Sequence, residues 1–325
     1  MLCTKRKLNF LWHKIGWKRA HRLKRIYFLQ WMHKQPMMKR HSFTCQNFLT
    51  LLCATAILFI VSACKKEIKN NLPPSPFSLT PKPFALTDHC KGFYEYLPEG
   101  YLTEGNTKYP LMIFIHGAGE VGTDSAALTF LLKNGPLKHV KNGSFPTSFS
   151  LNKQTYKFII IAPQFTSGDS PYPDEMDKII EYAKKNYRVD ASRIYMTGLS
   201  FGGAVCWNYV GASPVYARKI AAMVAIGAYL NEFRSEFAID AVKAKSIASS
   251  NVPIWSTHNK GDDHSALVWV TDAYKLLNNY RPSMVPSPKL TIFDADGHEG
   301  WTTTYDPSFK ENNMNIYQWM LQYHR

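Results

Sequence analysis

IYMTGLSFGGAV, residues 194–205, places a serine between glycines two positions before it and two positions after it. The apolar residues before Ser200 predict a buried strand, and the small and apolar residues after it predict a helix. A nucleophile on such a strand-to-helix turn requires Gly198 and Gly202, because the strand and the helix cross too closely for side chains. Since G-x-S-x-G also occurs by chance, the rest of the chain must supply a base, an acid and an oxyanion site.

Short apolar runs alternate with helical patterns through residues 85–325, which we expect to form one domain. Continuous apolar strands are typical of a parallel sheet that is covered on both faces. The predicted strands are 111–115, 157–162, 193–197, 221–227, 252–257 and 290–295, after a leading antiparallel strand within 91–101. The predicted helices are 174–187, 201–211, 265–280 and 309–324. This alternation predicts an α/β fold, a doubly wound and mostly parallel sheet with helices on both faces.

Polar motifs follow the predicted strands, at the edge of the sheet where chemistry collects in such folds. HNKGDDH, residues 258–264, and DGHEGW, residues 296–301, come after the last two strands. His298 is the predicted general base for Ser200, because a strand precedes it and glycines surround it. Asp262 and Asp263 both qualify as the acid that orients this histidine. The order serine, aspartate, histidine is the one expected of an α/β-hydrolase.

The loop HGAGE, residues 116–120, follows the first strong strand. Its glycines let the backbone approach a substrate oxygen, so the Ala118 N–H is a candidate oxyanion donor. The Phe201 N–H, at the start of the helix after the serine, is the second candidate. His116 and Glu120 are expected to brace the loop through hydrogen bonds rather than to catalyse.

Gln164, which follows a strand, either faces the pocket and binds substrate or simply caps that strand. Trp301 and Trp207 either line an acyl or aromatic site or belong to the core. We predict Gln164 and Trp301 as substrate-binding residues.

HGAGE, APQ, YRVDASRIYMTGLSFGG and GHEGW together resemble the α/β-hydrolase superfamily over about residues 94–319. More narrowly, they resemble the esterases and peptidases grouped with polyhydroxybutyrate depolymerases, feruloyl and acetyl-xylan esterases, and prolyl-oligopeptidase-like catalytic domains. The family's H-G-x-x-D motif selects Asp262, with Asn259 replacing the usual glycine. The serine mechanism expected of these residues requires no metal or cofactor. Val121 stands where relatives often carry arginine. Phe201 stands where they often carry methionine, which should reshape the pocket while leaving the backbone donor in place.

The positive charge of the chain is concentrated at its N-terminus. Of the 39 Lys and Arg residues, 12 lie within residues 1–63, which hold no Asp or Glu, leaving 27 basic against 24 acidic residues beyond. This distribution argues against a nucleic-acid partner, because a binding face needs its charge on the folded domain.

The apolar run 48–63, which follows Lys39 and Arg40 and ends at Cys64, resembles a bacterial lipoprotein signal in which Cys64 carries the lipid. The alternative is an uncleaved signal anchor. Both place the body outside the cytoplasm and attach it to the membrane. Residues 64–84 are expected to form a polar, Pro-rich tether. Residues 1–36 are not needed for a signal peptide, as expected if the start of the gene has been placed too far upstream.

Cys90 and Cys206 are the cysteines that remain beyond the signal region. They can form a disulfide in an oxidising compartment. Cys206 falls in the apolar run after Ser200, however, which favours a small buried side chain instead. No cysteine or histidine spacing predicts a metal site.

Three functions are compatible with these motifs. The first is a serine esterase acting on acylated carbohydrates or small esters. The second is a serine peptidase, which is less favoured because no stretch predicts a propeller gating domain. The third is a lipid-anchored binding protein without catalysis.

Overall fold

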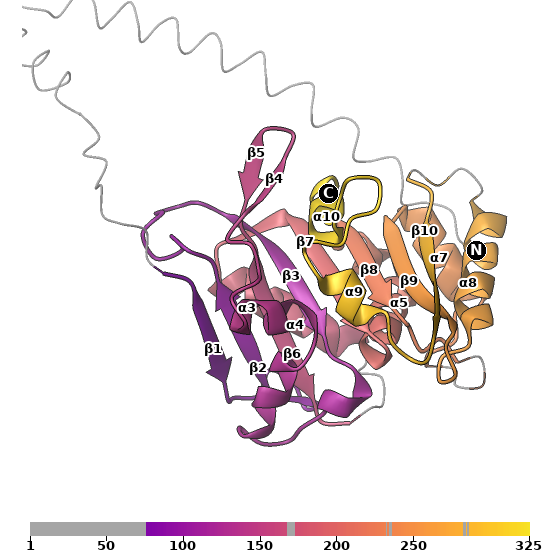
Figure 1. The fold of residues 1–325 in the computed structure, drawn as a ribbon, viewed down its shortest axis with the longest axis horizontal. Helices are drawn as coiled ribbons and strands as arrows, with labels where there is room; N and C mark the ends of the chain where they lie inside the picture. The colour runs from indigo at the N-terminus through magenta and orange to yellow at the C-terminus, as the bar shows by residue number, and fades with distance from the viewer. Residues whose placement is uncertain (1–75, 168–172, 232, 234–235, 282–283, 285) are drawn as a thin grey trace, which may run out of the picture. The chain divides into compact units, whose positions relative to one another are not determined.

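The computed structural model describes residues 76–325 apart from 168–172, 232, 234–235, 282–283 and 285 (Figure 1). The predicted signal, Cys64 and most of the predicted tether lie outside these described residues. Within the described part of the chain, no helix is both long enough and apolar enough to cross a bilayer.

An eight-stranded sheet forms the centre of the domain, in the order β1-β2-β6-β3-β7-β8-β9-β10 (Figure 1). β1 pairs with β2 and β2 with β6 in antiparallel fashion, whereas every other neighbouring pair is parallel. The strands are β1 Ser78–Lys82, β2 Cys90–Leu97, β3 Tyr109–Ile115, β6 Ile159–Phe165, β7 Val189–Leu199, β8 Ala222–Ile226, β9 Ile254–Gly261 and β10 Lys289–Asp296. The predicted α/β class is therefore confirmed, and this strand order is that of an α/β-hydrolase fold.

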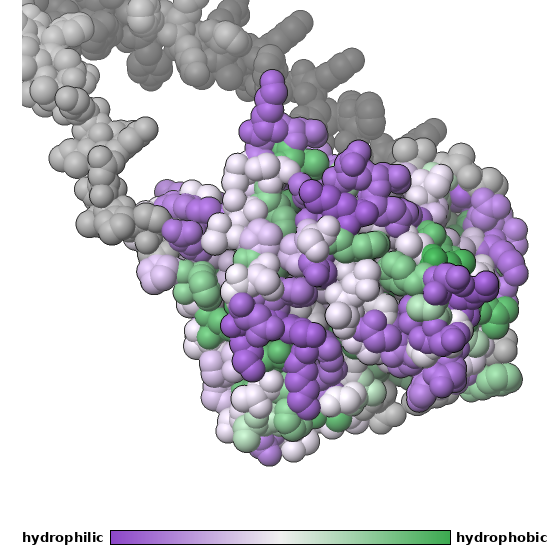
Figure 2. Space-filling model, viewed as in Figure 1, coloured by the Kyte–Doolittle hydropathy of each residue, from purple (hydrophilic) through white to green (hydrophobic). Residues whose placement is uncertain are grey.

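Helices cover the sheet on both faces. The helices are η1 Ala118–Glu120, η2 Ala127–Leu132, α3 Gly135–Lys141, α4 Pro173–Asn186, α5 Phe201–Ala212, α6 Pro214–Ala217, α7 Ala241–Ser250, α8 Leu267–Tyr280, α9 Trp301–Tyr305 and α10 Ile316–Leu321. A small hairpin, β4 Phe149–Leu151 and β5 Gln154–Tyr156, stands outside the main sheet. Figure 2 shows hydrophilic and hydrophobic residues interspersed on the face in view, as on an ordinary protein surface.

The strand side chains alternate between two hydrophobic clusters, one on each face. Leu111, Ile113 and Ile115 of β3 join the cluster that contains residues of α4, α5, α7 and α8. Met112 and Phe114 join the cluster that contains residues of η2, α3 and α10. Because successive strand residues point to opposite faces, a strand that is apolar throughout must be covered on both sides. This explains why the predicted strands read as unbroken apolar runs.

The crossing of α5 over the sheet leaves no room for a side chain at either glycine of the G-x-S-x-G motif. A Cβ atom on Gly202 would lie 2.1 Å from the carbonyl oxygen of Ile115. One on Gly198 would lie 2.4 Å from the carbonyl oxygen of Gly202. Both contacts are with backbone, which cannot rotate away as a side chain can. The structure therefore confirms that the close crossing of strand and helix requires glycine at both positions.

The C-terminal helix is much shorter than the predicted 309–324. Asn312 and Asn313 adopt φ values of 53° and 65°, in the left-handed region that interrupts a helix. The Asn315 side chain then accepts a hydrogen bond from the Gln318 N–H and caps α10, which begins at the next residue. The pattern of apolar residues alone does not mark where the helix begins. The turn-forming asparagines before α10 set its first residue.

The limits of the sheet also differ from the prediction. β1 lies within residues 64–84, the predicted tether, so the folded domain begins before residue 85. Pro81 is compatible with this strand because β1 is an edge of the sheet. β10 forms the other edge and is not buried on both faces, since Ile292 is 46% exposed. β9 continues through Gly261, so HNKG, the first four residues of the HNKGDDH motif, belongs to the strand rather than to the loop beyond it.

Cys90 and Cys206 are both buried free thiols, so the alternative of a disulfide between them is wrong. Burial raises the pKa of the Cys90 thiol to about 12 and that of Cys206 still further. Both side chains thus act as small apolar residues of the core.

We predict that Gly202→Ala destabilises the domain by about 4 kcal/mol or more, because the added methyl group collides with the backbone of β3. Gly119→Ala is the matched control, since nothing lies within 4 Å of a Cβ at that position. Urea unfolding followed by circular dichroism measures both variants. Equal unfolding midpoints for the two variants would contradict the tight crossing.

Candidate active site

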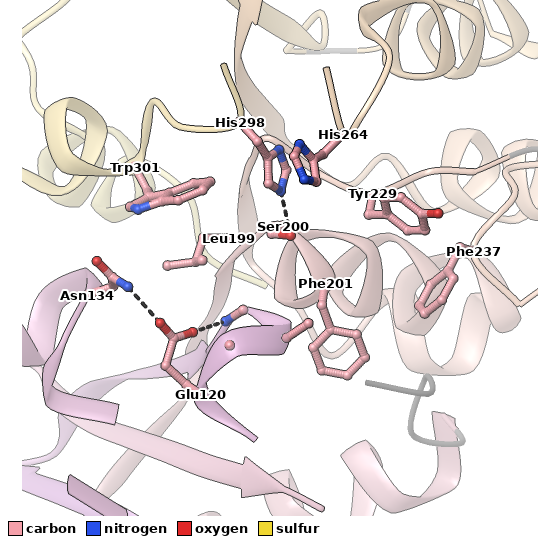
Figure 3. Close-up of a pocket in the computed structure, with 13 residues that line it drawn as sticks. Glu120, Asn134, Leu199, Ser200, Phe201, Tyr229, Phe237, His264, His298 and Trp301 are labelled. Atoms are coloured by element: carbon pink, nitrogen blue, oxygen red, sulfur yellow. Dashed lines mark hydrogen bonds between the residues drawn. The ribbon is translucent and has the colours of Figure 1, made fainter. Parts of the chain in front are cut away.

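Ser200 occupies a sharp turn between β7 and α5 (Figure 3). Its backbone has φ 52° and ψ −118°, a conformation that a residue with a side chain rarely adopts. Hydrogen bonds on both sides hold it there: its N–H donates to Ile226 O at 2.8 Å, and its carbonyl oxygen accepts from Tyr229 N at 3.2 Å. The turn places the hydroxyl group of Ser200 at the surface of a cavity.

Ser200, His298 and Asp262 form a continuous hydrogen-bonded chain. Ser200 Oγ lies 2.7 Å from His298 Nε2, and His298 Nδ1 lies 2.8 Å from Asp262 Oδ2. A carboxylate only accepts hydrogen bonds, so the proton of the neutral imidazole is on Nδ1 and Nε2 is free to accept the Ser200 proton. The structure thus brings together three side chains that are 98 and 36 residues apart in the sequence.

Asp262, rather than Asp263, is the aspartate beside His298. Its other carboxylate oxygen, Oδ1, accepts from the N–H groups of His264 at 2.9 Å and Ser265 at 2.7 Å. Asp263 instead pairs with the His264 ring, and its side chain is 71% exposed. The Asp262 side chain is completely buried, so its negative charge is compensated by these donors and by His298.

A second histidine, His258, lies behind Asp262. Its Nε2 atom donates to Ser265 O at 2.7 Å and lies 3.4 Å from Asp262 Oδ2. Burial lowers the pKa of His258, which favours the neutral ring at neutral pH. His258 therefore anchors the loop that carries Asp262.

Two rings enclose the imidazole of His298. The His264 ring stacks on it with centroids 5.4 Å apart and an interplanar angle of 19°. The Trp301 ring meets it edge-on, with centroids 5.2 Å apart and an angle of 80°. These contacts limit rotation of the His298 side chain and favour the orientation that reaches Ser200.

Ala118 and Phe201, the predicted oxyanion donors, both line the cavity next to Ser200. Phe201 begins α5, and the first N–H groups of a helix have no acceptor within it. Ala118 begins η1, and Glu120 holds this short helix by accepting a hydrogen bond from Gly117 N at 2.7 Å. Both predicted donors therefore belong to residues at the wall of the cavity that holds Ser200.

The side chain of His116 stabilises the loop of residues 116–120 through two hydrogen bonds. Its Nδ1 atom lies 2.7 Å from Gly117 O, and its Nε2 atom accepts from Phe165 N at 2.9 Å. Since the Phe165 N–H occupies Nε2, the ring proton must be on Nδ1. His116 is fully buried, and burial lowers its pKa from 6.5 to about 4.

The prediction that Gln164 binds substrate is wrong. Its side chain is 2% exposed and does not line the cavity. Its Nε2 atom donates to Glu120 O at 2.9 Å and to Ala127 O at 2.6 Å. Gln164 therefore connects the loop after β3 to η2. Trp207, the other open alternative, lies in the core with no exposed surface, whereas Trp301 lines the cavity.

The cavity has a volume of about 440 Å³. Besides residues already described, its lining includes four residues that were not predicted to line it: Asn134, Tyr229, Phe237 and His264, whose ring stacks on His298. Three of them lie in segments whose course is not fixed by any strand or helix pattern. Only His264, within the HNKGDDH motif, carried a signal that could have been followed. Among the described residues, no group of three or more His, Cys, Asp or Glu side chains is arranged to hold a metal ion.

Neither a protein-family model nor a curated protein matches this chain. Solved structures similar to it include a thermostable esterase, with 20% identity over 77% of this chain and 63% of that chain and a TM-score of 0.48. The feruloyl esterase module from Clostridium thermocellum complexed with sinapinate shows 15% identity over 72% and 88%, with a TM-score of 0.49. An acylaminoacyl peptidase shows 17% identity over 69% and 38%, with a TM-score of 0.46.

This chain therefore spans less than two thirds of the thermostable esterase. The α/β-hydrolase fold follows from the sheet order and the turn at Ser200, independently of these similarities.

We predict that the domain loses stability as the pH falls from about 6.5 to about 4, through His116. Its folded-state pKa lies below the unfolded one, so the unfolded chain takes up the proton first and unfolding becomes easier in acid. At about 1.4 kcal/mol per pKa unit, this single group contributes about 3 kcal/mol of loss. Urea unfolding of wild type and His116→Asn over this range measures the slope, which should be shallower in the variant. Parallel pH profiles would contradict the prediction.

Proposed function

We propose that this protein is a serine hydrolase that cleaves carboxylic esters through an acyl-enzyme. The observation that carries the proposal is the hydrogen-bonded chain from Ser200 through His298 to Asp262. A serine hydroxyl is a weak nucleophile unless an oriented base accepts its proton, and this geometry supplies that base. The strained turn at Ser200 and the position of Ala118 and Phe201 at the cavity wall support the same proposal.

The reaction would proceed in two halves. Ser200 Oγ attacks the ester carbonyl carbon while His298 Nε2 takes the hydroxyl proton, and the Ala118 and Phe201 N–H groups stabilise the oxyanion. His298 then gives this proton to the departing alkoxide, which leaves as the alcohol and the acyl group stays on Ser200. A water molecule, deprotonated by His298, attacks the acyl-enzyme, and the proton returns to Ser200 as the carboxylic acid is released. Asp262 holds the imidazole tautomer and stabilises its charged form throughout.

The substrate class and the location are part of the proposal. A cavity of about 440 Å³ with aromatic walls suits a small ester or an acylated carbohydrate. Cleavage of a peptide, the alternative, uses the same three side chains and differs only in the leaving group. The apolar run 48–63 and Cys64 support a protein exported across the cytoplasmic membrane and anchored there by a lipid or an uncleaved signal.

We predict that Ser200→Ala lowers the hydrolysis of p-nitrophenyl acetate at least about ten-thousandfold, because no other group replaces the nucleophile. The same variant should lose labelling by a fluorophosphonate probe. Ser249→Ala, at an exposed serine on α7, is the control and should retain both. Hydrolysis and labelling that persist in Ser200→Ala would refute the proposal, and a protein without catalysis would stay unlabelled in every form.

Asp262→Asn and Asp263→Asn form a matched pair of neighbouring substitutions. In Asp262→Asn, the backbone N–H groups of His264 and Ser265 keep the amide oxygen on their side, which turns the amide NH₂ toward His298 Nδ1. The imidazole then carries its proton on Nε2 and cannot accept one from Ser200, so kcat should fall by about a thousandfold or more. Asp263→Asn should change kcat by less than about threefold, since its carboxylate is exposed. Equal losses in the two variants would contradict the assignment of Asp262.

A further inference from the structure

Asn134 lines the cavity, and its side chain does not cap the helix that follows it. It occupies the N-cap position of α3, where an asparagine oxygen ordinarily accepts a hydrogen bond from the first turn of the helix. Here the side chain makes no such bond. Its Nδ2 atom instead donates to Glu120 Oε1 at 2.6 Å. Asn134 therefore lacks the stabilising cap contact with α3, and its side chain instead contacts Glu120 at the cavity wall.

The network around Glu120 determines which way the Asn134 amide points. The Glu120 carboxylate accepts from Gly117 N through Oε2 and from Asn134 through Oε1. Because a carboxylate cannot donate, the NH₂ end of the Asn134 amide must face it, and the oxygen end must face away. Figure 3 shows the amide oxygen on the side of Asn134 opposite Glu120. No described residue forms a hydrogen bond with this oxygen, so its acceptor capacity is available to a ligand.

Trp301 lies on the same side of Ser200 as Asn134, and Figure 3 shows its indole nitrogen at the end of the ring away from His298. No described residue accepts a hydrogen bond from that nitrogen. The other end of the ring contacts His298, the group that would hand a proton to the leaving alcohol. This side of the cavity, defined by Asn134 and Trp301, therefore combines a free acceptor, a free donor and an aromatic face next to the leaving-group position.

The opposite side of the cavity, defined by Phe201, Tyr229 and Phe237, is mainly aromatic (Figure 3). The Phe201 and Phe237 rings meet edge-to-face at 6.1 Å, and Tyr229 meets Phe237 in the same way at 5.8 Å. The Tyr229 hydroxyl accepts a hydrogen bond from Asn231 Nδ2 at 2.7 Å, and Figure 3 shows it at the end of the ring away from Ser200. An apolar acyl group fits these walls, which leaves the polar side of the cavity for the alcohol.

We propose that Asn134 Oδ1 accepts a hydrogen bond from a hydroxyl group of the alcohol half of the substrate, and that Trp301 binds the same hydroxylated ring. A hydroxyl group both donates and accepts, so it matches the free oxygen and the free indole N–H together. A sugar ring also presents an apolar face that can pack against the indole. The inference rests on the proposed ester hydrolysis and specifies its substrate as an acylated sugar or polyol.

Two acetate esters of the same shape test this specificity. In 6-O-acetylglucose the ester oxygen is attached through a methylene group to a hydroxylated six-membered ring, and tetrahydropyran-2-ylmethyl acetate has the same ring without hydroxyls. Wild type should prefer the hydroxylated ester by about fivefold to tenfold in kcat/KM, the effect of one or two neutral hydrogen bonds. Asn134→Ala should bring the ratio to within about twofold of unity.

The ratio is the readout because the loss of the Asn134–Glu120 bond can weaken the loop and slow both substrates alike. Asn142→Ala, at an exposed asparagine at the other end of α3, is the matched control and should keep the wild-type ratio. Trp301→Phe retains a ring beside His298 but removes the indole donor, so it should reduce the preference and provides a second test if Asn134→Ala folds poorly.

A preference that is unchanged in both Asn134→Ala and Trp301→Phe would overturn the inference, as would a wild type that does not distinguish the two esters. Hydrolysis of p-nitrophenyl acetate by the same preparations separates this failure from failure of the proposed function. If that ester is cleaved and the two ring esters are not distinguished, the proposed ester hydrolysis is supported and the proposed recognition of a sugar ring is refuted. If p-nitrophenyl acetate is not cleaved, both are refuted.

Discussion

The close passage of α5 over β3 and β7 positions everything else in the site. At Gly202 the helix backbone comes so near to β3 that a Cβ atom would lie 2.1 Å from the Ile115 carbonyl oxygen. The chain can enter this helix only through a sharp turn, which leaves Ser200 at φ 52°. Backbone strain of this kind costs about 1–3 kcal/mol and persists only where the surrounding packing enforces it. Here the enforcement comes from a helix that is buried along nearly its whole length.

The other groups of the site converge on this turn because parallel strands end at the same edge of the sheet. β3 leads into the loop that carries Ala118, β9 leads to Asp262, and β10 leads to His298. Each loop is then fixed by its own hydrogen bonds: His116, Glu120 and Gln164 hold the first, and Ser265 and His258 hold the second. His298 has fewer such bonds and is enclosed by the rings of His264 and Trp301 instead. The side chains of Ser200, His298 and Asp262 are thus held in one hydrogen-bonded arrangement, which is the preorganisation that the proposed reaction needs.

The parts of this arrangement that could be predicted from the sequence are those with a local signature. Apolar runs revealed the strands, and the position of motifs after the strands indicated the residues that the structure brings together at Ser200. What could not be predicted depends on long-range packing. Gln164 follows a strand like the other site residues, yet its amide is drawn into a gap between two loops. Asn134 gave no sign because the absence of its cap bond is visible only in three dimensions. The late start of the last helix depends on left-handed asparagines that apolar periodicity does not register.

Trapping of an acyl-enzyme determines whether the strained Ser200 is the nucleophile. The folded protein is mixed rapidly with p-nitrophenyl acetate and quenched in acid, and its peptides are then examined by mass spectrometry. If Ser200 is the nucleophile, we expect a burst of about one p-nitrophenolate per chain and a single acetylated peptide that carries the modification on Ser200. Acetyl transfer to another residue, or steady turnover with no burst and no trapped acetyl group, would contradict it.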